Sequence, residues 1–219
     1  MTFERYLKKN YVVACEMQCA IVSDGKIVKS LRENSTNLQL VKSWMVSYNL
    51  FQGINTAQRD AIANGFLQFS RNYKSSNRQL TSTDIEEQFG ELLLALYRIV
   101  NRSWLSATSK LLWCIYPDQV VLYDSFVYRS LTVLQCVDAD LTAFPRIGSP
   151  PKFDSEASIN KAVQHYMGFQ NLVKHLQQVH QSALDRLREK NKETCSYEYD
   201  IRIIDKLLWM IGNSNYEQK

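Results

Sequence analysis

Glycine and proline are scarce in this 219-residue chain, which contains seven glycines and four prolines. An all-β protein of this size needs many tight turns, and those turns depend heavily on the two residues. With 45% hydrophobic and 22% charged residues, the chain also has enough apolar side chains to form a core, so extensive disorder is not expected. The composition therefore predicts a mainly α-helical, multi-helix globular domain.

Long hydrophobic runs are absent as well. No apolar run approaches the roughly eighteen residues that a membrane-spanning helix needs. Near the N-terminus, acidic Glu16 interrupts the first apolar stretch, and no clean small-residue cleavage site follows it. We therefore expect no contact with a membrane, no secretory signal and a cytoplasmic protein.

Cysteine is present, but not in a pattern that predicts a disulfide framework. The five residues are odd in number and scattered, at Cys15, Cys19, Cys114, Cys136 and Cys195. Cys15 and Cys19 can share one face of a helix, but two thiols without two further ligands do not make a zinc site. The pattern favours reduced thiols that behave as small hydrophobic residues.

Familiar cofactor and metal motifs are also missing. The chain has no P-loop, no Gly-x-Gly-x-x-Gly and no Gly-x-Ser-x-Gly. Its three histidines all fall in residues 158–190, and His175 and His180 are not spaced by one helical turn. We therefore expect no cofactor, no histidine-based metal site and no catalytic triad.

The charge balance is mildly basic, with a net charge of +4 and a pI near 8.7. This permits nucleic-acid binding without requiring it. In one polar stretch the cations Arg71, Lys74 and Arg78 alternate with Phe69 and Tyr73, a combination that can hold phosphate and stack bases. A solvated loop gives the same pattern, and we take that simpler interpretation for residues 71–80.

Hydrophobic residues recur at helical spacing through most of the chain. Two capping boxes are predicted, Asn55 with Gln58 and Thr83 with Glu86, and two further N-caps at Ser103 and Asp124. The predicted helices cover residues 38–48, 57–69, 85–100, 103–115, 125–137, 158–190 and 199–211.

The first 28 residues admit two interpretations. A helix over residues 3–24 fits the apolar spacing, with Gly25 just past its end. A short β-hairpin over residues 20–28, turning at Asp24-Gly25, fits too. We prefer the helix. The length suits one helical domain over 1–219, or two packed helical lobes with a cleft near 101–130.

The most distinctive segment runs from Ser103 to Val127. A helix start rich in small residues is followed by an apolar helix, a turn at Pro117 and a short apolar run, and Asp124 then stands at the mouth of the next helix. This layout resembles the active-site region of the helix-hairpin-helix DNA glycosylase superfamily, which includes the 8-oxoguanine glycosylases.

The resemblance implies a helical fold around a cleft that receives a flipped base of duplex DNA. The matching carboxylate is Asp124, which would stabilise positive charge developing on the sugar or orient a water molecule. We expect the DNA-binding residues at Arg102, Ser106, Lys110 and Arg129.

The segment departs from the family pattern in two respects. No glycine lies between Asn101 and Lys110, whereas the family hairpin carries glycines that approach phosphate. The nucleophilic lysine of bifunctional members would fall near Ala107, so Schiff-base chemistry is not expected from Lys110. A catalytically degenerate member is therefore included in the hypothesis.

Asp124 also has a purely structural interpretation, because Asp is among the best N-cap residues. A non-enzymatic alternative follows, in which the long helix over 158–190 pairs with a protein partner or with a second copy of the chain. A sequence-specific nucleic-acid binder without catalysis is a third possibility. The observation that separates the first two is whether Asp124 faces a pocket.

Overall fold

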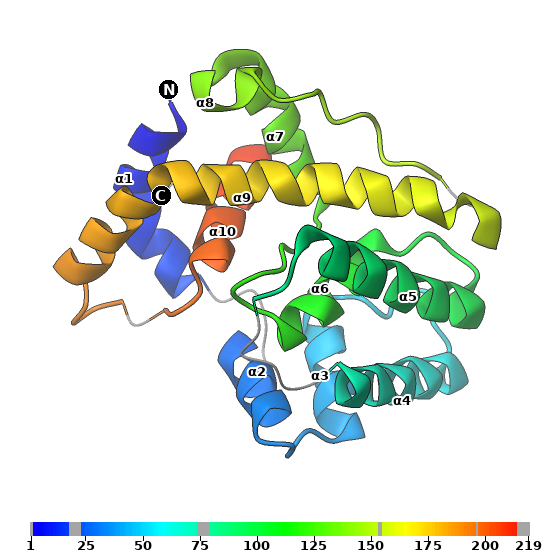
Figure 1. The fold of residues 1–219 in the computed structure, drawn as a ribbon. Coiled ribbons are helices and arrows are strands. Elements are labelled where there is room, and N and C mark those ends of the chain that lie inside the picture. The colour runs from blue at the N-terminus through cyan, green and yellow to red at the C-terminus, as the bar shows by residue number, and fades with distance from the viewer. Residues whose placement is uncertain (1, 18–22, 74–78, 153–154, 196, 214–219) are drawn as a thin grey trace. The chain divides into compact units, whose positions relative to one another are not determined.

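The computed structural model describes residues 2–17, 23–73, 79–152, 155–195 and 197–213. These residues form helices and no strand (Figure 1), which confirms the predicted mainly α-helical fold. The helices are α1 (Phe3–Glu16), α2 (Asp24–Arg32), α3 (Leu38–Ser47), α4 (Thr56–Asn72), α5 (Ser82–Val100), α6 (Leu105–Ile115), α7 (Ser125–Val137), α8 (Ala139–Thr142), the 3-10 turn Glu156–Ser158, α9 (Ile159–Lys190) and α10 (Asp200–Gly212).

The N-terminal region differs from both of its predicted forms. The first helix ends at Glu16, and a second helix begins after Ser23, whose hydroxyl accepts a hydrogen bond from the Lys26 N–H at 3.3 Å. Gly25 therefore lies inside a helix. The hairpin is wrong for residues 23–28, because a serine cap outweighs the Asp-Gly turn signal, and residues 20–22 lie outside the described part.

Two helix starts confirm the predicted caps. Asn55 and Gln58 form the expected capping box of α4, and Asp124 caps α7. The box of α5 begins two residues earlier than predicted. Its N-cap is Thr81, whose N–H donates to the Asp84 carboxylate at 2.8 Å. Aspartate thus takes the role that the prediction gave to a glutamate.

Two further boundaries were predicted incorrectly. The residue at the N-cap of α6 is Trp104, which provides no side-chain hydrogen bond, and not Ser103. Residues 139–142, which none of the predicted helices covers, form the short helix α8. Asp138 caps it by accepting from the Asp140 N–H at 3.1 Å.

The contacts divide the chain into two compact units. Unit 1 comprises Met1–Met17, Val121–Ser149 and His165–Lys219, and unit 2 comprises Gln18–Val120 and Pro150–Gln164. The chain thus passes from unit 2 into unit 1 between α6 and α7. Unit 2 is nearly continuous in sequence, whereas unit 1 is assembled from three separate segments.

Unit 2 is a bundle built from α2 to α6. Within it α4 packs on α3 and α5, and α6 packs on α2 and α5. Large aromatic side chains fill its core with almost no exposure, namely Trp44, Phe66, Phe89 and Trp113. Burial of a side chain of this size contributes about 1.5–3 kcal/mol relative to exposure.

Unit 1 is centred on α10, which packs against both α7 and α1. The approach of α10 to α7 is so close at Gly212 that a Cβ atom there would stand 1.9 Å from the Phe126 carbonyl oxygen. The N-terminus of α1 is held by the Phe3 N–H, which donates to the Asp138 carboxylate at 2.9 Å.

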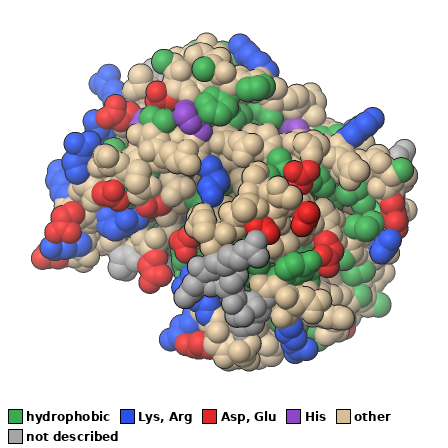
Figure 2. Space-filling model, in the orientation of Figure 1, with side chains coloured by type: hydrophobic (Ala, Val, Ile, Leu, Met, Phe, Trp, Pro, Cys, Tyr) green, Lys and Arg blue, Asp and Glu red, His purple; other side chains and the backbone are tan. Residues whose placement is uncertain are grey.

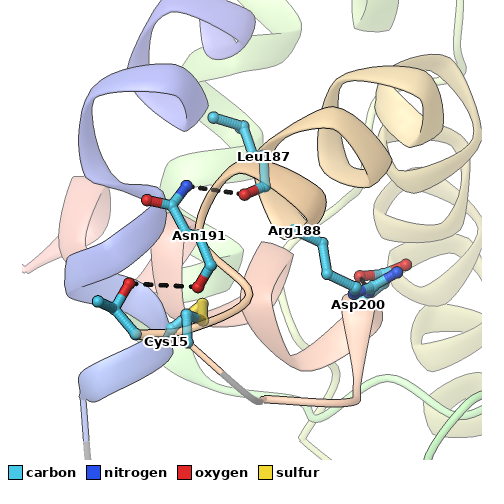
Figure 3. The surroundings of a disulfide bond; sticks show 7 residues. Cys15, Leu187, Arg188, Asn191 and Asp200 are labelled. Atoms are coloured by element: carbon cyan, nitrogen blue, oxygen red, sulfur yellow. Dashed lines mark hydrogen bonds and ion pairs between the residues drawn. A yellow bond between two sulfur atoms is a disulfide. The ribbon is translucent and has the colours of Figure 1, made fainter.

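A disulfide bond joins Cys15, at the end of α1, to Cys195, after α9. Figure 3 shows this region, where the Asn191 amide donates to the Leu187 carbonyl at 2.7 Å. The expectation of reduced thiols is therefore wrong for these two residues. Folding brings together two cysteines 180 positions apart in the sequence, a proximity that spacing alone cannot reveal.

Reduction of this disulfide is expected to destabilise unit 1. A long closed loop restricts the unfolded chain strongly, and a bond of this kind contributes about 2–5 kcal/mol. Cys15→Ser should lower the melting temperature by about 5–15 °C, and a reductant should then change it no further. Cys136→Ser is the control, because Cys136 is an exposed free thiol. Mass spectrometry that found free thiols at both positions in non-reduced protein would contradict the assignment.

Gly212→Ala is expected to lower the free energy of unfolding by about 1–3 kcal/mol, because the new methyl group would force α10 away from α7. Denaturant unfolding measures the change. Gly25→Ala is the matched control, since nothing lies within 4 Å of a Cβ at that helical position, and a small gain of about 0.4–1 kcal/mol is expected there. Equal unfolding midpoints for Gly212→Ala and wild type would refute the close packing.

Candidate functional site

Asp124 lies at the start of α7, where the sequence predicted a carboxylate at a helix mouth. The helix α6, the turn at Pro117, the buried run Val120–Tyr123 and α7 follow one another in the expected order. Asp124 is half-buried, and its Oδ1 accepts a hydrogen bond from the Phe126 N–H at 2.9 Å. Asp124 is thus the N-cap residue of α7.

Lys110, predicted to contact phosphate, is buried within unit 2 with only 6% of its surface exposed. Its ammonium donates to the Ser106 hydroxyl at 2.6 Å, one turn earlier on α6, and lies 5.9 Å from the centre of the Tyr48 ring. The two predicted DNA-binding residues of α6 are therefore bonded to each other. In this conformation, Lys110 has little surface to offer a phosphate.

A buried carboxylate lies close to this lysine in the bundle. Asp24, at the start of α2, accepts hydrogen bonds from the Tyr48 hydroxyl at 2.5 Å and from the Trp44 indole at 3.4 Å. Tyr48 thus contacts Asp24 with its hydroxyl and Lys110 with its ring face. Since a buried charge is costly unless it is hydrogen-bonded, these contacts explain how α2, α3 and α6 tolerate polar groups at their junction.

The two predicted arginines are both held by backbone carbonyls. The Arg102 guanidinium donates to the Gln52 carbonyl at 3.0 Å and lies 4.6 Å from the Trp104 ring centre, and burial lowers the pKa of Arg102. Arg129 donates to the Gly212 carbonyl at 3.3 Å but remains exposed. The structure places Arg102 with Ser106 and Lys110 in unit 2, and Arg129 with Asp124 in unit 1.

Unit 2 contains a pocket that the sequence did not reveal. Its volume is about 690 Å³, and Asp124 is not among the residues around it. The C-terminal ends of α2, α4 and α6 meet there. The lining consists of Leu31, Arg32, Asn34, Thr36, Leu67, Ser70, Arg71, Gln79, Cys114, Ile115, Tyr116, Pro117, Asp118 and Gln119.

The wall of this pocket formed by residues 114–119 is tied to the chain after α4. The Tyr116 hydroxyl donates to the Tyr73 carbonyl at 2.7 Å, and the Gln119 side chain accepts from the Leu80 N–H at 2.6 Å. These two bonds fix the chain on either side of residues 74–78, which lie outside the described part. From the predicted basic stretch, Arg71 lines the pocket.

Charges of both signs are mixed on the molecular surface. On the face drawn in Figure 2, Lys and Arg side chains are interspersed with Asp and Glu and do not gather into one basic patch. Arg32, at the rim of the pocket, likewise lies 3.7 Å from Asp118. On this face a phosphate contact would therefore come from individual cations.

The described residues bring no three His, Cys, Asp or Glu side chains together in a geometry that could hold a metal ion. Their helices include none with the length and apolar character to cross a membrane.

Replacement of Asp124 by alanine is expected to lower the free energy of unfolding by about 0.5–2 kcal/mol, because the Phe126 N–H loses its acceptor. Asp124→Asn keeps an acceptor oxygen and should remain within about 0.5 kcal/mol of wild type. Urea unfolding of both variants measures the difference. An equal loss of unfolding free energy in the two variants would contradict the capping geometry.

No protein-family model, curated protein sequence or solved structure matches this chain.

Proposed function

We propose that this chain binds duplex DNA and acts on it as a base-excision glycosylase does, with Asp124 as the catalytic carboxylate. The observation that carries the proposal is the half-buried Asp124 at the N-terminus of α7, directly after the turn and extended run that follow α6. The resemblance in sequence and this local geometry support the same residue.

The proposed reaction is hydrolysis of the N-glycosidic bond. The bond electrons leave with the base, positive charge develops on the sugar, and water adds at the sugar carbon. The proton that the water releases neutralises the departing base. A carboxylate near the sugar stabilises that charge, and such electrostatic stabilisation is commonly worth several kcal/mol of the barrier. The Phe126 N–H holds the Asp124 carboxylate in place by a hydrogen bond to Oδ1.

Lys110 is not proposed as a nucleophile. An amine must be accessible to attack the sugar carbon and form a Schiff base, whereas Lys110 is buried and bonded to Ser106. The proposal is therefore a monofunctional hydrolase without strand cleavage. A catalytically degenerate protein would bind DNA without releasing a base, and only the DNA-binding part of the proposal would then apply.

Arg129 is the predicted phosphate contact that the structure leaves most accessible. It is exposed, and its guanidinium lies 5.4 Å from the Phe126 ring, on the first turn of the helix that Asp124 caps. A guanidinium there can reach a phosphate while the Gly212 carbonyl orients it. Arg102 is less available, because it is partly buried against Trp104.

The alternative based on the long helix has less support. The apolar stripe that it requires includes Val163, Tyr166, Val173, Leu176 and Ala183, and all of them are buried within the chain itself. A partner could not pack on these side chains while they remain covered. Asp124 lines neither of the pockets described for this chain, so the burial of this stripe alone favours DNA binding over a helix-mediated protein interaction.

The test is a binding titration with duplex DNA that contains an abasic-site analogue, beside intact duplex and single strand, at about 50 and 200 mM salt. We expect a preference for the abasic duplex and weaker binding at high salt. Arg129→Gln should weaken binding to all forms and reduce the salt dependence by about one counterion. Arg5→Gln is the control, because Arg5 is exposed on α1.

A base-release screen with damaged duplexes tests the chemistry separately. Asp124→Asn, with its fold checked by circular dichroism, should bind the abasic duplex but release no base. If the wild-type protein binds no DNA at low salt, the proposal fails and Asp124 is a helix cap only.

A further inference from the structure

The pocket of unit 2 takes no part in the chemistry proposed for Asp124. Its volume of about 690 Å³ falls within the range of roughly 300–1,000 Å³ that small-molecule sites occupy. Among the residues that line it, Tyr116 and Cys114 are almost completely buried, whereas Arg71 and Gln79 are exposed.

The charges around the pocket nearly balance. The ends of α2, α4 and α6 each bring the negative end of a helix, equivalent to about half a charge, and Asp118 adds one more. Arg32 and Arg71 offset most of this with two positive charges. The interior therefore suits a neutral ligand body with hydrogen-bond donors and acceptors.

The lining favours a flat ring. Apolar side chains of Leu31, Leu67, Ile115 and Pro117 offer surfaces for the faces of a ring. The Asn34 and Gln79 amides can donate to or accept from its edge, whereas the Thr36, Ser70 and Gln119 side chains already hydrogen-bond within unit 2. A heteroaromatic ring with several hydrogen-bonding atoms fits such a lining, and nucleobases have that chemistry.

The two arginines differ in their contacts. Arg32 lies beside the Asp118 carboxylate, but Arg71 makes no hydrogen bond or ion pair within the part of the chain that the structure describes. Arg71 is exposed in the last turn of α4. Its guanidinium is therefore available at the rim, and guanidinium groups bind phosphate oxygens in a bidentate manner.

From the size, lining and charge of the pocket, we propose that it binds a nucleoside 5′-phosphate unit, with the base inside and the phosphate at Arg71. Two sources share this chemistry, namely a free mononucleotide and a nucleotide of a single-stranded nucleic acid. The site is separate from Asp124 in the sequence and does not depend on glycosylase activity.

Isothermal titration calorimetry with adenosine, guanosine, cytidine and uridine, and with their 5′-monophosphates, tests the proposal. At least one monophosphate should bind about tenfold more tightly than its nucleoside, which corresponds to about 1.4 kcal/mol for the contact with Arg71. In Arg71→Gln the monophosphate should fall to the affinity of the nucleoside, and the nucleoside should be unaffected. Arg5→Gln is the matched control for an exposed helical arginine.

Leu67→Trp, which fills the pocket from α4, should abolish binding of both forms, with circular dichroism as the check on folding. If that variant does not fold, Arg71→Gln alone decides, because it changes only an exposed side chain. The absence of binding by any nucleoside or monophosphate, or an equal affinity of wild type and Arg71→Gln for the monophosphate, would overturn the proposal.

Titration with trinucleotides that carry a 5′-phosphate identifies which of the two sources supplies the ligand. Tighter binding of a trinucleotide than of the mononucleotide, lost in Arg71→Gln, would support single-stranded nucleic acid as the natural ligand. Tighter binding of the mononucleotide would support a free nucleotide. Because the assay uses neither duplex DNA nor base release, its failure can be told apart from failure of the proposed function.

Discussion

The constraint on which the rest of the structure depends is the discontinuity of unit 1. Residues 18–120 and 150–164 of unit 2 separate its three segments, so the contacts between those segments join distant parts of the sequence. Such contacts must overcome the entropy of closing long loops before they stabilise anything. The Cys15–Cys195 disulfide, the Phe3–Asp138 hydrogen bond and the close packing at Gly212 all act at these junctions.

The same packing fixes the position of Asp124. The Ser130 hydroxyl, on α7, donates to the Leu208 carbonyl of α10, and Gly212 allows α10 to lie directly on the first turns of α7. Arg129 adds a bond from α7 to the end of α10. A carboxylate at the start of α7 is thus carried on a helix that is held along its length, which is what a catalytic group needs for a constant orientation.

Local signals in the sequence predicted much of the fold. The caps Asn55 and Asp124 were identified correctly because a side chain and the N–H group it binds are close in sequence. The capping box of α5 was predicted two residues too late because the usual pattern ends in glutamate or glutamine, whereas this box uses Asp84. Ser103 failed as a cap because a suitable residue type does not guarantee suitable geometry.

Long-range features could not be predicted in this way. Nothing near Cys15 or Cys195 indicates a partner at the other end of the chain, and the pocket of unit 2 requires the ends of three helices to meet. Lys110 shows a similar limit. Its helical position was correct, but its burial depends on the packing of α2 and α5 on α6 and on the contact with Tyr48, which a single helix pattern does not contain.

The arrangement of unit 1 also sets an order on its synthesis. At about 5–20 residues per second, Cys195 leaves the ribosome roughly ten to forty seconds after Met17, and α10 follows it. Helices α2 to α6 are complete about halfway through this interval, once Ile115 has been made, whereas the apolar face of α1 has no α10 to cover it until the interval has ended. Helix α1 is therefore made before α2 to α6 but reaches its place after them. The side chains of α1 that the finished fold buries, Tyr6, Leu7 and Tyr11 among them, are where a nascent chain would most need protection.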